Sequence, residues 1–173
     1  DRIYIKITYN HAAVGADQAT VSIANNDSSA TPFTFLIAGK GLSPLEAWRQ
    51  QWFGTTENTG NAANAADFDT DGIVNLMEWA CGLDPTSSSG SPVGLEHKGT
   101  HLEFTYPRCI AALNSGVDFT VQWSDGLQSV ESWGESGVTE QVISDNGVVQ
   151  MVKASVPIGV QRRFVRLQVS MSP

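Results

Sequence analysis

Residues 67–78, DFDTDGIVNLME, carry the most informative pattern of the chain. Asp67, Asp69 and Asp71 occupy alternate positions in it, and like charges so close together repel one another. A glycine follows at once, and an apolar run then leads to Glu78. A bound cation would offset the repulsion, so this stretch predicts a metal-binding loop that runs into a helix.

The spacing of these residues matches a calcium-binding loop. Such loops supply oxygen ligands from positions 1, 3, 5, 7, 9 and 12 and require glycine at position 6. Counting from the first aspartate places each required residue type at its position. The expected ligands are the side chains of Asp67, Asp69, Asp71, Asn75 and Glu78 and the backbone carbonyl of Ile73.

An acidic, solvated turn that caps a helix is the alternative interpretation of this stretch. It accounts for one aspartate, but not for three at alternate positions with a glycine and a glutamate at the matching offsets. The chain holds no second loop of this kind. Because sensor proteins usually open through paired loops, calcium is expected here as a structural ion.

Alternating apolar and polar side chains dominate both ends of the chain. Residues 1–41 contain the runs IYIKITY, ATVSIAN and FTFLIA, which predict three strands of a half-buried antiparallel sheet. Residues 91–173 show the same period in HLEFTYP, DFTVQW and RRFVRLQVSM, and EQVISDNGVVQMVKASV is typical of a hairpin; together they predict about five or six strands. Between two of these strands, the dipeptide Asn146-Gly147 predicts a type I′ hairpin turn.

The middle of the chain has helical signals instead. Ser43 is the expected N-cap, Pro44 the first helical residue and Glu46 the capping-box partner. The acidic loop then leads into a second short helix, NLMEWACGL, which Asp84-Pro85 ends. The expected parts of the chain are residues 1–41, 42–90 and 91–173.

Charge and composition exclude two classes of partner. The formal net charge is −8, and positive side chains gather only at Arg162, Arg163 and Arg166, so a nucleic acid would be repelled. No apolar run approaches the roughly 20 residues of a membrane-spanning helix. Cys81 and Cys109 would pair in an oxidising compartment or remain buried thiols in a reducing one, and the sequence leaves both outcomes open.

Residues suited to catalysis are sparse, and the chain is expected not to be an enzyme. His97 and His101 are four apart but have a glycine between them, so a zinc pair on one helix face is not expected. No nucleophile elbow or phosphate-binding loop occurs. Tyr106, Trp123 and Trp133 are candidates for a sugar-stacking platform, although such aromatic side chains more often form core.

Residues 45–85, LEAWRQQWFGTTENTGNAANAADFDTDGIVNLMEWACGLDP, resemble a module near the C-termini of large secreted bacterial proteins. The calcium loop is similar to those of thrombospondin type 3 repeats and dockerin half-repeats. Cys81 departs from the pattern, in which an aliphatic residue is expected, and this favours its pairing with Cys109. The resemblance implies calcium binding by the loop residues named above.

Residues 1–41 resemble the second half of a choice-of-anchor D domain, a Hydin-like sandwich of immunoglobulin type. The stretch that carries the resemblance is ATVSIANNDSSATPFTFLIAGKG, residues 19–41. Residues 91–173 look like the β region that often ends the same exoproteins. These resemblances imply an extracellular or cell-surface location, adhesion or assembly, and no catalysis.

The N-terminal resemblance covers only half a domain. An immunoglobulin-like sandwich has about seven strands, whereas residues 1–41 predict three, so their apolar faces need a partner. That partner is the chain's own C-terminal β part, strands of another copy, or a missing half upstream. The sequence leaves these alternatives open.

The expected fold is mainly β, with immunoglobulin-like β-sandwich parts joined by a small helix–calcium loop–helix module. The expected function is that of a secreted, calcium-stabilised, non-enzymatic structural module for extracellular or cell-surface assembly. Self-association is the expected mode of partnership, up to a filament subunit completed by strands of a neighbouring copy. The alternative is a carbohydrate-binding, adhesive C-terminal module of a larger exoprotein.

Overall fold

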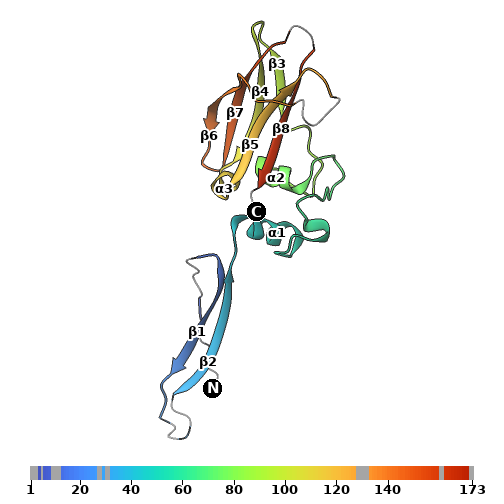
Figure 1. Ribbon diagram of the computed structural model, residues 1–173. Coiled ribbons are helices and arrows are strands. Elements are labelled where there is room, and N and C mark those ends of the chain that lie inside the picture. The colour runs from blue at the N-terminus through green and yellow to red at the C-terminus, as the bar shows by residue number, and fades with distance from the viewer. Residues whose placement is uncertain are drawn as a thin grey trace. The chain divides into compact units, whose positions relative to one another are not determined.

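The protein is mainly β, with antiparallel strands and short helices (Figure 1). It divides into two compact units, an N-terminal unit of residues 1–43 and a C-terminal unit of residues 44–173. This computed structural model describes residues 4, 6–8, 13–26, 29, 32–127, 133–159 and 162–171.

The N-terminal unit contains an antiparallel hairpin of β1 (Gly15–Ile23) and β2 (Phe33–Gly41). Its register pairs Val21 with Phe35 and puts apolar side chains of both strands on one face, as the alternation predicts. The other predicted strand, residues 3–9, falls largely outside the described residues. The described part of it, Tyr4 and residues 6–8, is assigned to no strand.

The C-terminal unit contains two antiparallel sheets. One has the strand order β3-β4-β7-β6, and the other pairs β5 with β8. The strands are β3 (Gly94–His97), β4 (His101–Cys109), β5 (Val117–Ser124), β6 (Thr139–Asp145), β7 (Val149–Pro157) and β8 (Phe164–Met171). The alternating runs predict β4, β5 and β8, and the predicted hairpin corresponds to β6 and β7, although every residue of β6 is exposed. No run predicts β3, which is only four residues long.

One hydrophobic core joins the two sheets of this unit. Phe104 and Tyr106 of β4 and Val152 of β7 share it with Val121 of β5, and all four side chains are buried. Val165 of β8 packs against them. The alternation in the sequence therefore correctly predicts which faces of these strands are covered.

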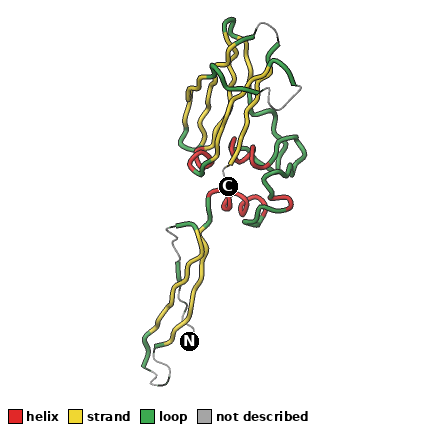
Figure 2. The backbone as a smooth tube through the Cα atoms, viewed as in Figure 1, coloured by secondary structure: helices red, strands yellow, loops and turns green. Residues whose placement is uncertain are grey.

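The helices of the C-terminal unit gather at one end of its strands (Figure 2). They are α1 (Pro44–Phe53), the 3₁₀ helix η1 (Gly60–Ala62), α2 (Asn75–Cys81) and α3 (Ile110–Asn114). Helix α1 begins at the predicted proline, and α2 ends at Gly82, whose φ of 72° gives a left-handed cap.

A second core packs these helices onto the strands. Leu45 of α1 and Trp79 of α2 share it with Ala112 of α3 and Val117 of β5. The helical segment and the C-terminal strands therefore form one compact unit. The predicted boundary near residue 41 lies close to a boundary between units, but the one predicted near residue 90 lies inside a unit, because this core extends across it.

The turn between β6 and β7 differs from the prediction. The backbone N–H of Asn146 donates to the carbonyl of Val149, so Gly147 and Val148 are the central residues. Positive φ is found at Gly147, 84°, but not at Asn146. Positive φ at the first central residue alone fits a type II′ turn rather than type I′. The Asn146 side chain instead accepts hydrogen bonds from the amides of Val148 and Val149.

Within the described ranges, no helix combines the length and the apolar character needed to span a bilayer.

Candidate metal centre

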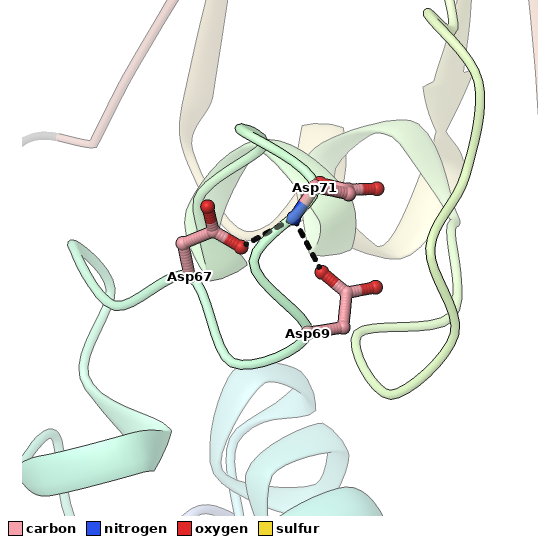
Figure 3. A group of neighbouring side chains, drawn as sticks. All are labelled: Asp67, Asp69 and Asp71. Atoms are coloured by element: carbon pink, nitrogen blue, oxygen red, sulfur yellow. Dashed lines mark hydrogen bonds between the residues drawn. The ribbon is translucent and has the colours of Figure 1, made fainter.

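Three of the predicted ligands lie together. One carboxylate oxygen each from Asp67, Asp69 and Asp71 lies within 4.8 Å of the other two. Figure 3 shows the carboxylates of Asp67 and Asp69 converging on the backbone amide of Asp71, at 3.2 Å from each. This cluster can hold a metal ion, because three carboxylates supply oxygen ligands and negative charge at one point.

Hydrogen bonds and unusual backbone angles shape the loop around the cluster. Asp67 also accepts from the amide of Gly72 at 2.9 Å, and Asp71 accepts from the amide of Ile73 at 2.8 Å. Gly72 has a φ of 93°, which glycine adopts readily. Thr70 has a φ of 64°, which is unfavourable for a side chain with a branched β-carbon and which no sequence signal predicts.

Asn75 opens α2 and is buried. Its amide nitrogen donates to the carbonyls of Asn61 and Ala63 at 2.8 and 2.9 Å, which fixes the orientation of the side chain. The amide oxygen is also buried, and within the described part of the chain it has no hydrogen-bond partner. An acceptor held in place without a donor is suited to a cation.

Glu78 lies one turn further along α2 and is fully buried. Both of its carboxylate oxygens lack a hydrogen-bond partner among the residues described, and so does Oδ2 of Asp69. Burial, and then the charges of Asp69, Asp71 and Asp67, raise the pKa of Glu78 from 4.5 to about 7. A buried carboxylate without a partner is costly to ionise, so a positive charge at this position would be strongly stabilising.

The remaining expected ligand is the backbone carbonyl of Ile73, whose side chain is half-buried. The structure therefore brings the three aspartates into one group and places Glu78 close enough for their charges to raise its pKa. All of the available donors are oxygens, which hard cations prefer over nitrogen- or sulfur-binding metals. The residues fit a metal ion of the calcium or magnesium type.

Arg49 supports the site, and the sequence reasoning missed it. This α1 side chain is buried, and its Nη2 donates to Oδ1 of Asn64 at 2.6 Å. The carbonyl of Asn64 in turn accepts from the amide of Leu76 in α2. Burial lowers the pKa of Arg49. Its position four residues after Leu45, on the apolar stripe of the helix, is the signal that identifies it in retrospect.

The aromatic residues proposed for sugar binding do not form one exposed platform. Tyr106 is fully buried in the core between the sheets. The guanidinium of Arg163 lies over the Trp123 ring at 3.7 Å from its centroid, and that of Arg166 over Trp133 at 4.3 Å. The sequence does not reveal these contacts because the partners lie more than 30 residues apart.

The cysteines and histidines contribute no second cluster within the described residues. Cys81 and Cys109 are both buried and both free thiols. Burial, and then the proximity of Cys109, raise the pKa of Cys81 to about 12, so its reactive thiolate form is disfavoured. His101 lies 3.6 Å from a carboxylate oxygen of Glu103, while His97 accepts from the amide of Gly99.

Comparison of this chain with protein-family models, with curated proteins and with solved structures finds no match.

Proposed function

We propose that this protein is a secreted, calcium-stabilised structural module of extracellular or cell-surface assemblies, without enzymatic activity. In this proposal the ion is calcium, and the chain associates with further copies of itself, up to a filament. The proposed ligands are Asp67, Asp69, Asp71, the carbonyl of Ile73, Asn75 and Glu78.

The observation that carries the proposal is the burial of Glu78 without a partner beside three aspartates. Three clustered carboxylates, and a fourth that is buried and raised in pKa by their charges, favour the binding of a divalent cation over hydration by water alone. Calcium is preferred over magnesium because calcium accepts six to eight oxygens in flexible geometry, as a loop of six ligands offers. Extracellular modules bind calcium at roughly 10⁻⁴ to 10⁻³ M, and a similar affinity is expected here.

The proposed role of the ion is structural. Glu78 lies on the same helix as Trp79 and Ala80, which belong to the core that packs the helices onto the strands. An ion held by the loop and by Glu78 would therefore fix α2 against that core. Its loss would loosen the end of the C-terminal unit where the helices lie.

The hairpin of the N-terminal unit supports the assembly part of the proposal. Phe33 and Leu36 are 56% and 69% exposed, and a lone two-stranded hairpin is marginally stable in water. The hairpin therefore gains from pairing or packing with further strands. The two sheets of the C-terminal unit share one core, as in an immunoglobulin-like module. In this proposal the C-terminal unit binds the strands of the hairpin.

Sedimentation of the purified chain over a range of concentrations, with millimolar calcium and then with excess chelator, tests the proposal. Species that grow with concentration in calcium and dissociate in chelator are expected. A monomer of unchanged size and unchanged melting temperature under both conditions would overturn both the calcium and the assembly parts.

A further inference from the structure

The strand edges of the C-terminal unit are protected unequally. Within the described residues, β3 is short, with four residues, and β6 carries two carboxylates and a register shift between Val142 and Ser144. The edge of β5 is bridged by two backbone hydrogen bonds between Trp123 and Gly134. Short strands, charges and bulges are the devices by which proteins block further strand pairing.

The outer edge of β8 has fewer of these devices: its one charged side chain is Arg166, and its register with β5 has no shift. This strand has eight residues, pairs with β5 on one side, and in the described structure no strand pairs with its other side. Figure 1 shows β8, in red, at the margin of its sheet. Its unpaired amides and carbonyls are a template for one more strand.

A groove runs beside this edge. It has a volume of about 390 Å³ and a mainly apolar lining that includes Val74, Met77, Val93, Phe104, Val165 and Leu167, with Arg166 as its one charged residue. Val165 and Leu167 come from β8 itself, while Val74 belongs to the acidic loop and Met77 to α2. We call it the β8 groove. A strand added to β8 would place alternate side chains in the groove and would complete a three-stranded sheet over the core.

We infer that the β8 groove binds residues 3–9 of a second copy of this chain as an added strand. This inference rests on the proposed function and names its contact surface. Ile3, Ile5, Ile7 and Tyr9 alternate with polar or amphipathic residues, so a strand here presents four apolar side chains to one face. Tyr4 is 85% exposed and Ile7 43%, and neither belongs to a strand.

Charge favours the same pairing. Residues 1–43 contain Arg2, Lys6 and Lys40 against Asp1, Asp17 and Asp27, a formal balance of zero. The whole formal charge of −8 therefore belongs to residues 44–173. Residues 3–9 carry one charge, that of Lys6, which is positive. A neutral-to-positive segment meets an acidic unit with less repulsion than two acidic units would meet each other.

Two variants, one defective in the donor strand and one in the groove, and a mixture of the two test this inference. Ile5→Glu with Ile7→Glu breaks the added strand, and Val93→Arg blocks the groove. Each variant alone is expected to stay a monomer in calcium, whereas the mixture forms a one-to-one complex through the intact groove of the first and the intact segment of the second. The control for the strand variant is Tyr4→Glu with Thr8→Glu, which places the same charges on the opposite face of the strand. The control for Val93→Arg is Leu95→Arg, which places the same charge beside the groove. Both controls should assemble as the wild type does.

A peptide keeps the test independent of folding defects in the variants. A labelled peptide of residues 1–10 is titrated into the Ile5→Glu, Ile7→Glu chain and followed by fluorescence anisotropy. It should bind about tenfold or more tightly than a peptide with asparagine at positions 3, 5 and 7. Equal binding of the two peptides, or no binding of either, would overturn the inference.

The outcomes separate the two proposals. If the wild type assembles and the Ile5→Glu, Ile7→Glu chain assembles equally well, the inference fails while the proposed function stands. If the wild type stays monomeric in calcium, the assembly function fails. In that case, a peptide that binds the Ile5→Glu, Ile7→Glu chain but not the wild type would show that residues 3–9 occupy the groove of their own chain. This outcome would also overturn the inference that they bind a second copy.

Discussion

Oδ2 of Asp71 accepts a hydrogen bond from the backbone amide of Ser89 at 2.7 Å. The two residues are 18 positions apart, so one side chain of the acidic loop holds the segment that leads into β3. This bond helps to explain why the helical segment and the C-terminal strands form one compact unit. It also leaves the other oxygen of Asp71 on the amide of Ile73, inside the loop.

Ser89→Pro should lower the free energy of unfolding of the C-terminal unit by about 1–2 kcal/mol. Proline has no backbone N–H, so the hydrogen bond from residue 89 to the Asp71 carboxylate would be lost. Urea unfolding in calcium, followed by tryptophan fluorescence, measures the loss. Ser88→Pro is the matched control, since Ser88 is exposed and adjacent. Equal destabilisation by the two substitutions would show that the bond contributes nothing.

Glu78→Gln should abolish most of the stabilisation by calcium. The amide keeps the size of the side chain but removes the charge and the two-oxygen grip. At calcium a hundredfold above its dissociation constant, the wild type gains about 2.7 kcal/mol, and the variant should gain little. Thermal melts with and without calcium measure the difference.

Glu135→Gln is the control for that experiment, because Glu135 is exposed and lies outside the loop. Calcium should stabilise this variant as much as the wild type. A calcium-induced shift in melting temperature that is the same for Glu78→Gln and the wild type would contradict the assignment of Glu78 as a ligand.

The calcium-free protein should lose stability as pH rises from about 4.5 to about 7. Burial and the neighbouring aspartates raise the pKa of Glu78 to about 7 in the folded state, above its ordinary value of 4.5. Between these values the folded state keeps a proton that the unfolded state has released, so the free energy of unfolding falls with rising pH. The full difference is on the order of 3 kcal/mol.

Urea unfolding in chelator across this pH range measures the effect, and the same series on Glu78→Gln isolates it from other carboxylates. The wild type should lose more stability than the variant as pH rises. Saturating calcium should remove this extra loss, because the ion favours the ionised carboxylate. Parallel curves for the two proteins in chelator would contradict the prediction.

The two cysteines should be protected thiols. Both are buried, and the pKa of Cys81 is raised to about 12, so an aromatic disulfide reagent at pH 8 should react slowly with the folded chain. Unfolding in denaturant without reductant should release two reactive thiols per chain. Fewer than two would indicate that Cys81 and Cys109 had paired.

Local patterns predicted much of this fold because their causes are local. The alternation in HLEFTYP fixes which side chains of β4 face the core, and Pro44 sets the start of α1. The spacing of the acidic loop brought Asp67, Asp69 and Asp71 together as expected. In each case the determining residues lie within about two turns or strand repeats of one another.

Features that depend on distant partners were missed. The hydrogen bond between Arg49 and Asn64 and the hydrogen bond from the Ser89 amide to Asp71 both require the packed unit. The predicted type I′ turn was wrong for a different, local reason. Asn146 accepts two amide hydrogen bonds from its own turn, and the positive φ moves to Gly147 alone.

The register shift in β6 has a consequence for the shape of any assembly. The β6 edge has a register shift, whereas no strand pairs with the outer edge of β8 in the described structure. In the assembly that we propose, each copy would therefore accept a strand on one side only and donate one from its N-terminal segment. Growth is then directional. One tip of the fibre ends in an empty groove and the other in a free donor strand, so the two tips elongate at different rates and a fragment with only one of these features acts as a chain terminator.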